Sequence, residues 1–270
     1  MSEQRWPTLF VPHGGGPWPF MEVAFGPADT WDGLAAYLRG LDSALGRRPQ
    51  AVLVTSSHWE TPRPTVSVSE RPPMLFDYFG FPKNTYELSY PAPGSPALAR
   101  KVRALLKSAG IASDEDGERG FDHAVFVPFM LVYPEADVPV VQLSMREDLD
   151  PAAHLAIGRA LTPLRDEDVL IVGSGMTYHN LRELQSGSPR GNAAADAFDA
   201  WLTEAVEAEP TDRDAELVRW SEAPGAQASH PRSEHLVPLM VAAGAAGADR
   251  GRRVFNDHVW GKAISGYQFG

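Results

Sequence analysis

The residues in this sequence that are best suited to chemistry are histidines, and several follow short apolar runs. His13 follows the run in LFVPHGGGP, His58 the run in VLVTSSHWE, and His179 the run and glycine-rich turn in VLIVGSGMTYHN. In an open α/β sheet, binding sites form at strand ends of this kind. One histidine at such a place is more often a hydrogen-bonded core or surface residue. Three at equivalent positions predict a shared site.

Three further histidines occur in motifs that could reach the same site. His123 lies in GFDHAVFVP, and His230 and His235 lie in SHPRSEHLVPL. The chain has no cysteine, so a metal site would be built from His, Asp and Glu side chains. Imidazole binds Fe(II), Zn and Cu, and a catalytic site uses three protein ligands and leaves positions open for substrate. A further histidine could then transfer protons, since the pKa of free imidazole lies near neutrality.

Two glycine-rich turns adjoin these histidines, but neither has the composition of a nucleotide-binding loop. HGGGP lacks the Lys and Ser/Thr of a phosphate loop, and GSGMTYH lacks the dinucleotide spacing and its acidic residue. Ser174 is also outside the G-x-S-x-G pattern of a serine hydrolase. We interpret Gly14, Gly15 and Gly16 either as giving close backbone access to a metal pocket or as a tight turn. Gly14, Gly15 and Trp18 are candidate substrate contacts.

Five segments in chain order carry a resemblance to a known family: HGGGP, SSHWE, FDHAVFVP, GSGMTYHN and HPRSEHLVPL. Together they resemble the class III (LigB-type) extradiol ring-cleavage dioxygenases, and most closely the DOPA 4,5-dioxygenase-like branch. The motifs span His13 to Leu239, which is most of the chain. The resemblance implies one catalytic domain over residues 1–270 with a LigB-like α/β fold, whose central sheet is mostly parallel or mixed and flanked by helices.

The resemblance also implies a role for each matched histidine. His13, His58 and His235 would bind one non-haem metal ion. His179 would lie close to that ion as acid/base catalyst or as an additional ligand, and His123 would lie beside the aromatic ring or the bound oxygen. Fe(II) is the metal expected for activity, and Zn(II) could occupy the same site.

Glu234 directly precedes His235, and the wider superfamily uses a glutamate as the third protein ligand. The motif HPRSEHL matches the branch in which the histidine binds the metal. Neighbouring residues on a helix diverge by about 100°. We therefore expect His235 to reach the ion and Glu234 to point elsewhere on its helix.

The activity implied by the resemblance is the insertion of both atoms of O2 into a catechol-type substrate, such as DOPA or a related dihydroxyphenyl compound. Three alternatives stay open on the sequence. A zinc hydrolase would use the same histidines to activate water. A Memo-type protein would bind partners without catalysis. A purely structural metal is the least favoured, since structural sites usually have four ligands and often include cysteine.

The histidines must be positioned by alternating strands and helices, which predict an α/β fold. Short apolar runs predict buried strands at Pro7 to Val11, Ala51 to Thr55, Val138 to Leu143 and Val169 to Val172. Helical patterns cover Thr30 to Leu45, Ser95 to Ala109, Pro151 to Pro163, Ala193 to Ala208 and Glu234 to Gly244. The aromatic stretch within Pro62 to Pro96 predicts a long ordered loop that, with Trp18, could wall an apolar pocket.

Composition limits the class of protein. The chain has 270 residues and 43% apolar residues, enough for one domain with a sizeable core. Its net charge of −11 and the lack of a Lys/Arg cluster argue against nucleic acid as a partner. No stretch approaches the ~20 apolar residues of a membrane span, and no signal peptide is evident. We expect a cytoplasmic monomer or homodimer that takes a small aromatic substrate and O2.

Overall fold

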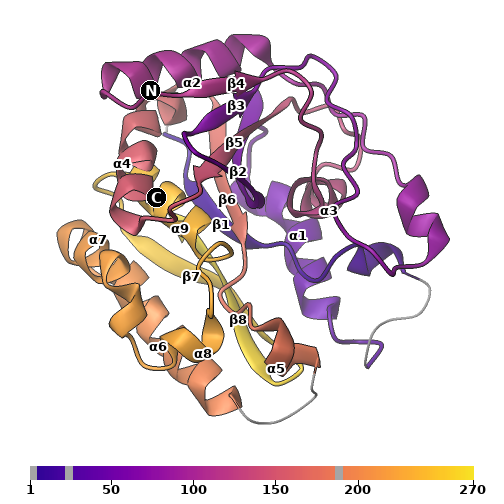
Figure 1. Ribbon diagram of the computed structural model, residues 1–270, viewed down its shortest axis with the longest axis vertical. Coiled ribbons are helices and arrows are strands. Elements are labelled where there is room, and N and C mark those ends of the chain that lie inside the picture. Colours follow the sequence, from indigo (N-terminus) through magenta and orange to yellow (C-terminus); the bar gives the residue numbers. More distant parts are fainter. Residues whose placement is uncertain (1–4, 22–26, 186–190) are drawn as a thin grey trace.

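A computed structural model describes residues 5–21, 27–185 and 191–270, and these build one mixed sheet in the order β4-β3-β5-β2-β6-β1-β8-β7 (Figure 1). The strands are β1 (Thr8–Pro12), β2 (Ala51–Thr61), β3 (Thr65–Ser67), β4 (Asp114–Asp116), β5 (Val140–Arg146), β6 (Val169–Gly175), β7 (Gly251–Val259) and β8 (Lys262–Phe269). The central strands β5, β2, β6 and β1 run parallel to one another. Strand β8 is antiparallel to both β1 and β7. The predicted α/β fold with a mixed sheet is confirmed.

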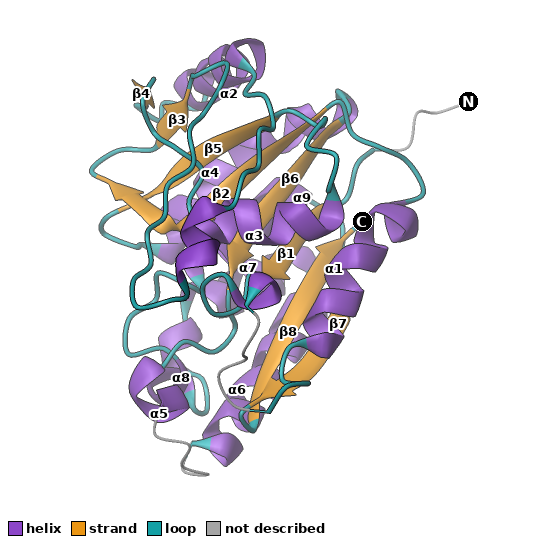
Figure 2. Cartoon of the chain, turned by 90° about the vertical axis from the view of Figure 1, so that its right-hand side faces the viewer, coloured by secondary structure: helices purple, strands orange, loops and turns teal. Residues whose placement is uncertain are grey.

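Helices cover both faces of this sheet. They are α1 (Asp32–Leu45), α2 (Pro96–Ser108), α3 (His123–Val132), α4 (Pro151–Leu161), α5 (Leu181–Gln185), α6 (Asn192–Glu207), α7 (Pro210–Val218), α8 (Ala226–Ser229) and α9 (Val237–Ala246). Helices α1 and α3 lie on one side and α4 and α9 on the other, as the two views show (Figures 1 and 2). No helix in the described part of the chain is long and apolar enough to cross a membrane.

The core divides between the two faces because side chains alternate along each strand. In β1, Leu9 and Val11 pack with α1 and α3. Phe10, between them, packs on the opposite face with α6 and α9. Strands that are buried on both faces have continuous apolar runs in their sequences. The four central strands were therefore predictable from the sequence.

Several boundaries differ from the prediction. Strand β2 continues to Thr61, so His58 lies within a strand and not beyond its end. Helix α4 ends at Leu161 and continues as a 3-10 turn. Helix α9 begins at Val237, three residues later than predicted. A start at Glu234 would bury the ring of Pro238 inside the helix, whereas a start at Val237 places it in the first turn, where no N–H is required.

Residues 62–95 form the long loop that the sequence predicts within Pro62 to Pro96, with β3 and a short 3-10 turn inside it. Its aromatic side chains pack on one another and on α3, with Phe76 and Phe126 at a ring-centroid distance of 5.9 Å. Phe81 reaches the turn after β1, because a Cβ atom added to Gly16 would lie 2.5 Å from its ring. The loop therefore covers the edge of the sheet at which β1 ends.

Candidate metal centre

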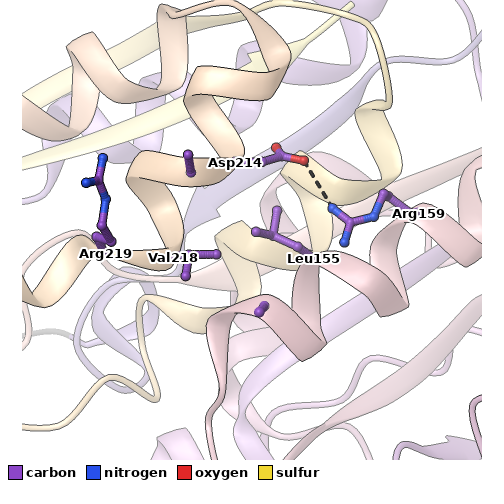
Figure 3. A pocket seen from close by; sticks show the side chains of 7 residues that line it. Leu155, Arg159, Asp214, Val218 and Arg219 are labelled. Atoms are coloured by element: carbon purple, nitrogen blue, oxygen red, sulfur yellow. Dashed lines mark hydrogen bonds and ion pairs between the residues drawn. The ribbon is translucent and has the colours of Figure 1, made fainter.

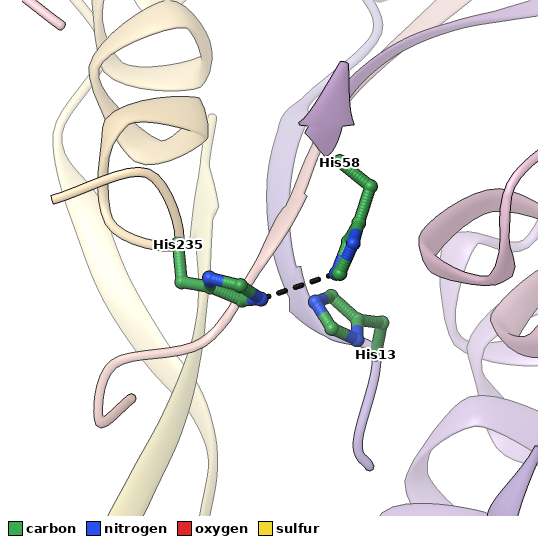
Figure 4. Close-up of side chains that lie close together, drawn as sticks. All are labelled: His13, His58 and His235. Atoms are coloured by element: carbon green, nitrogen blue, oxygen red, sulfur yellow. Dashed lines mark hydrogen bonds between the residues drawn. The ribbon is translucent and has the colours of Figure 1, made fainter. Parts of the chain in front are cut away.

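Three histidines from distant parts of the chain meet at this edge (Figure 4). His13 directly follows β1, His58 lies in β2, and His235 lies in the turn before α9. The ring centroids of His58 and His235 are 4.9 Å apart, and both are 5.2 Å from that of His13. One nitrogen of each ring lies within 4.8 Å of the others. The structure thus brings together the three histidines that the resemblance singled out as ligands.

Strand β6 explains why these three histidines converge. It lies between β1 and β2 and is parallel to both, so all three strands end at one edge. His13 N donates to Gly175 O at 3.1 Å, and Met176 N donates to His235 O at 2.9 Å. A Cβ atom at Gly175 would lie 2.1 Å from His235 O, so the glycine lets the turn before α9 lie against the strand.

His58 shares a carboxylate with His123, the first residue of α3. Asp77 Oδ2 lies 3.1 Å from His58 Nδ1, and Asp77 Oδ1 lies 2.9 Å from His123 Nδ1. His123 N also donates to Asp77 Oδ1 at 3.0 Å. Sequence reasoning missed Asp77, although an acidic residue inside the aromatic segment LFDYFGF was a usable signal.

His179 lies against His235, with the two rings stacked at a centroid distance of 3.3 Å. Glu234 Oε1 lies 3.1 Å from His179 Nδ1 and 2.9 Å from His235 Nδ1. The expectation that Glu234 points away from the site is therefore wrong. It failed because these residues lie in a turn and not on a helix, so the helical angle between neighbours does not apply.

His13 is held by the turn that follows it. Its Nε2 lies 3.1 Å from Ser57 Oγ, and its buried Nδ1 has no hydrogen-bond partner among the described residues. Trp18 Nε1 donates to His13 O at 2.8 Å. The buried Trp18 and Gly14 thus support the backbone of His13, while Gly15 is exposed.

Burial and the neighbouring carboxylates set the charges in the cluster. Burial, followed by the adjacent imidazoles, lowers the pKa values of His13 and His235 well below their usual range. Burial also lowers the pKa of His58, but the hydrogen bond to Asp77 and nearby acidic charges outweigh it and raise the value overall. Burial raises the pKa of Asp77, yet its bonds to two imidazoles hold that pKa well below normal. Burial also raises the pKa of Glu234, but the hydrogen bond to His179 and the neighbouring positive charges outweigh it and lower the value overall.

The donor set fits a divalent transition metal. His13 and His235 are buried and neutral at pH 7, and metal ligation requires neutral imidazole. His58 Nε2 and His235 Nε2 lie only 3.2 Å apart and both point to the centre of the cluster. Nitrogen ligands without sulfur suit Fe(II) or Zn(II).

Two other features lie outside this cluster. His230 is buried, and its Nε2 donates to Thr177 O at 2.9 Å, so it is part of the core.

A pocket of about 410 Å³ lies between α4 and α7, beside the pair of Arg159 and Asp214 (Figure 3). It has no cluster of histidines or acids that converge on one point, so the histidine cluster is the better candidate for chemistry.

The aromatic loop forms a wall beside the cluster. The ring of Tyr78 lies edge-on to His123 at 5.8 Å, and Phe81 lies edge-on to Tyr78 at 5.2 Å. Tyr78 is itself fixed by a hydrogen bond of 2.6 Å from its hydroxyl to Thr85 O. Next to it along the chain, Phe79 is 91% exposed. A rigid apolar wall next to imidazoles suits a planar ring.

Comparisons with known proteins agree with this geometry. The family model for the catalytic LigB subunit of aromatic ring-opening dioxygenase matches residues 12–267. A 4,5-DOPA dioxygenase extradiol from Beta vulgaris is 41% identical over 84% of each chain. The dioxygenase tasH from Hapsidospora irregularis is 38% identical over 98% of this chain and 85% of its own.

A solved structure has the same fold. An uncharacterized protein from Escherichia coli K12 matches with a TM-score of 0.78 and 31% identity, over 98% of this chain and all of the other. The histidine cluster, the mixed sheet and the family match lead to one conclusion. The chain belongs to the LigB family of aromatic ring-opening dioxygenases and is a class III extradiol dioxygenase.

Proposed function

We propose that this enzyme opens the ring of a catechol-type substrate, such as DOPA or a related dihydroxyphenyl compound, at one non-haem metal ion bound by His13, His58 and His235. Fe(II) is the active metal, and Zn(II) can take its place without supporting the reaction. The proposal rests above all on the convergence of three imidazoles, one nitrogen of each within 4.8 Å of the others, at the end of the central strands. The names of the curated DOPA dioxygenase relatives support the substrate class.

An ion held by His13, His58 and His235 would supply open coordination positions for the catechol oxygens and O2. Side chains of this protein transfer the protons and orient the substrate. The His179 side chain is 19% exposed and stacks on His235, so it can meet a substrate hydroxyl as that hydroxyl approaches the site. His179 removes a hydroxyl proton and later returns it, as a general base and then a general acid.

His123 lies on the other side of the cluster, with its ring centroid 4.1 Å from that of His58. Its Nδ1 is held by Asp77, which leaves Nε2 to hydrogen-bond oxygen or a substrate hydroxyl. Tyr78 packs on His123 and orients the ring plane of the substrate. The carbon–carbon bond beside the two hydroxyls breaks, both atoms of O2 enter the product, and a yellow muconic semialdehyde forms.

Oxygen uptake by the purified enzyme tests this proposal. The protein is prepared anaerobically, loaded with Fe(II) or Zn(II) in parallel, and given DOPA, caffeate, protocatechuate or simple catechol. We expect O2 consumption and a yellow product with Fe(II) only. His13→Ala and His235→Ala should reduce the rate by at least about 1000-fold, because each removes a ligand that the site needs.

His258→Ala is the matched control, because His258 is an exposed histidine paired with Asp196 and lies outside the cluster. It should retain the full rate. A lack of O2 uptake with every catechol, under Fe(II), would contradict the proposal. Zinc-dependent ester or amide cleavage without O2 would favour the hydrolase alternative instead.

A further inference from the structure

Asp77 contacts two imidazoles that have different roles in the proposed function. Its Oδ2 faces Nδ1 of His58, a proposed metal ligand, and its Oδ1 faces Nδ1 of His123, a proposed partner of oxygen. The side chain of Asp77 is only 18% exposed. It is anchored further by the backbone N–H of His123 at the start of α3, where a negative charge is also favoured by the helix dipole.

Glu234 repeats this arrangement on the other side of the cluster. Its Oε1 lies against Nδ1 of His235, a proposed ligand, and against Nδ1 of His179, the proposed acid/base. The Glu234 side chain is 14% exposed, and Arg232 lies 3.5 Å from its other oxygen. Each carboxylate thus joins one ligand histidine to one histidine that handles protons.

These contacts determine where each imidazole carries its hydrogen. An ionised carboxylate can only accept hydrogen bonds, and a neutral imidazole has one N–H and one lone pair. An Nδ1 atom at 2.9 to 3.1 Å from a carboxylate oxygen must therefore be the N–H nitrogen. The lone pair is then on Nε2, and in His58 and His235 the two Nε2 atoms face each other at 3.2 Å.

We infer that Asp77 and Glu234 are positioning residues, each of which holds one ligand histidine and one proton-transferring histidine in the Nδ1–H tautomer. The tautomers follow from the contacts alone, whereas the two roles rest on the proposed function. A metal-bound imidazole commonly donates a hydrogen bond to a carboxylate from the ring nitrogen that does not bind the metal. What the geometry adds here is that each carboxylate is shared, so one substitution alters both metal binding and proton transfer.

A competing arrangement would place additional ions beside the carboxylates, since His58, Asp77 and His123 also have potential ligand atoms within 4.8 Å of one another. In that case His58 would carry a metal on both ring nitrogens and would have to lose its last N–H. A measured metal content of one ion per chain would agree with our inference, and a content of two or more ions per chain would contradict it.

Side-chain nitrogen NMR of histidine-labelled, zinc-loaded protein tests the tautomers directly, because the ion then takes the Nε2 lone pairs of His58 and His235. We expect Nδ1–H in His58, His123, His179 and His235. The chain supplies an internal reference for each form, because backbone carbonyls accept from both reference rings. His154 donates from Nδ1 to Asp150 O, and His230 donates from Nε2 to Thr177 O.

Substitution of each carboxylate by its amide supplies the second readout. An amide accepts through oxygen but donates through nitrogen, so one of the two imidazoles must move its proton to Nε2. Asp77→Asn should change the spectra of His58 and His123 only, and Glu234→Gln those of the other pair. Each should weaken Zn(II) binding by about 10- to 100-fold, measured by competition with a chelator.

Asp199→Asn is the matched control, since Asp199 is a buried carboxylate whose described hydrogen bonds are to Ser265, Arg253 and Asn256 and to no imidazole. It should leave all four tautomers unchanged and the Zn(II) affinity within about 3-fold of wild type. Equal losses in Asp77→Asn and Asp199→Asn, or Nε2–H in zinc-loaded wild-type His58 and His235, would overturn the inference. Both readouts use zinc-loaded protein without catechol, so their outcome does not depend on ring cleavage.

Discussion

At the scale of single residues, the turn after β1 depends on one glycine and one tryptophan. Gly14 has a φ of +80°, and a Cβ atom there would lie 2.1 Å from Trp18 Nε1. Trp18 Nε1 is the donor that holds His13 O. The backbone conformation of the HGGG turn and the position of His13 are therefore linked through the indole ring.

Gly14→Ala should lower the free energy of unfolding by more than about 1 kcal/mol, because alanine is strained at positive φ and its methyl group displaces Trp18. It should also weaken Zn(II) binding, since His13 O loses its donor. Urea unfolding and chelator competition measure the two effects.

Gly15→Ala is the control for this substitution, because Gly15 is exposed and its Cβ atom would meet only the edge of Trp31, at 3.4 Å. Stability and zinc affinity close to wild type are expected for it. Equal behaviour of the two variants would show that Trp18 does not link the turn to His13.

At the scale of elements, the contact between β6 and the turn before α9 places His235. The absence of a side chain at Gly175 allows the Met176 N–H to bond His235 O at 2.9 Å. This contact brings the last of the three proposed ligands to the sheet edge where the other two lie.

Gly175→Ala should separate these two elements, because its methyl group would lie 2.1 Å from His235 O. We expect a loss of Zn(II) affinity of at least about 10-fold, comparable to the loss of a contact that orients a ligand. Gly40→Ala, within α1 and with nothing near its Cβ, should keep the affinity and raise stability by up to about 1 kcal/mol. Wild-type affinity in Gly175→Ala would contradict this account of how His235 is placed.

Comparison of these elements with the sequence shows what pattern can predict. The four central strands were predictable because both their faces are buried. His13 directly follows β1 as the pattern predicts, whereas His58 lies inside β2 because that strand continues beyond its apolar run. Helix α3 was missed because it is apolar on all sides and has no amphipathic period. Strands β7 and β8 were missed because polar residues interrupt them. The segment LFDYFGF marks Asp77 as unusual, but the imidazoles that Asp77 and Glu234 contact could not be predicted, because only the tertiary fold brings these segments together.

At the scale of the whole molecule, buried neutral histidines make stability depend on pH. Burial lowers the pKa of His230 from its usual value of 6.5 to about 4. The unfolded chain therefore takes up a proton before the folded protein does as the pH falls. The stabilisation from neutral His230 is complete above about pH 6.5 and is lost progressively as the pH falls towards 4.

His230→Gln should flatten this dependence, since glutamine can still donate to Thr177 O but does not titrate. Between pH 7 and pH 4 the metal-free wild type should lose about 3 kcal/mol more than the variant, from a pKa difference of about 2.5. Urea unfolding at several pH values, with a chelator present, measures the difference. Parallel curves for the two proteins would mean that His230 is not buried in its neutral form.

The order of the strands has a consequence for the life of the chain in the cell. Strand β1 pairs with β6 and with β8, and both of these strands are synthesised after it. His13 therefore cannot contact His235 until the later segment that contains His235 has been synthesised. An ion cannot be held by all three imidazoles until His235 has emerged from the ribosome, so the proposed metal site cannot form on the part of the chain synthesised before it. A chain that stops before His235 would lack one of the three proposed ligands and could not complete the site.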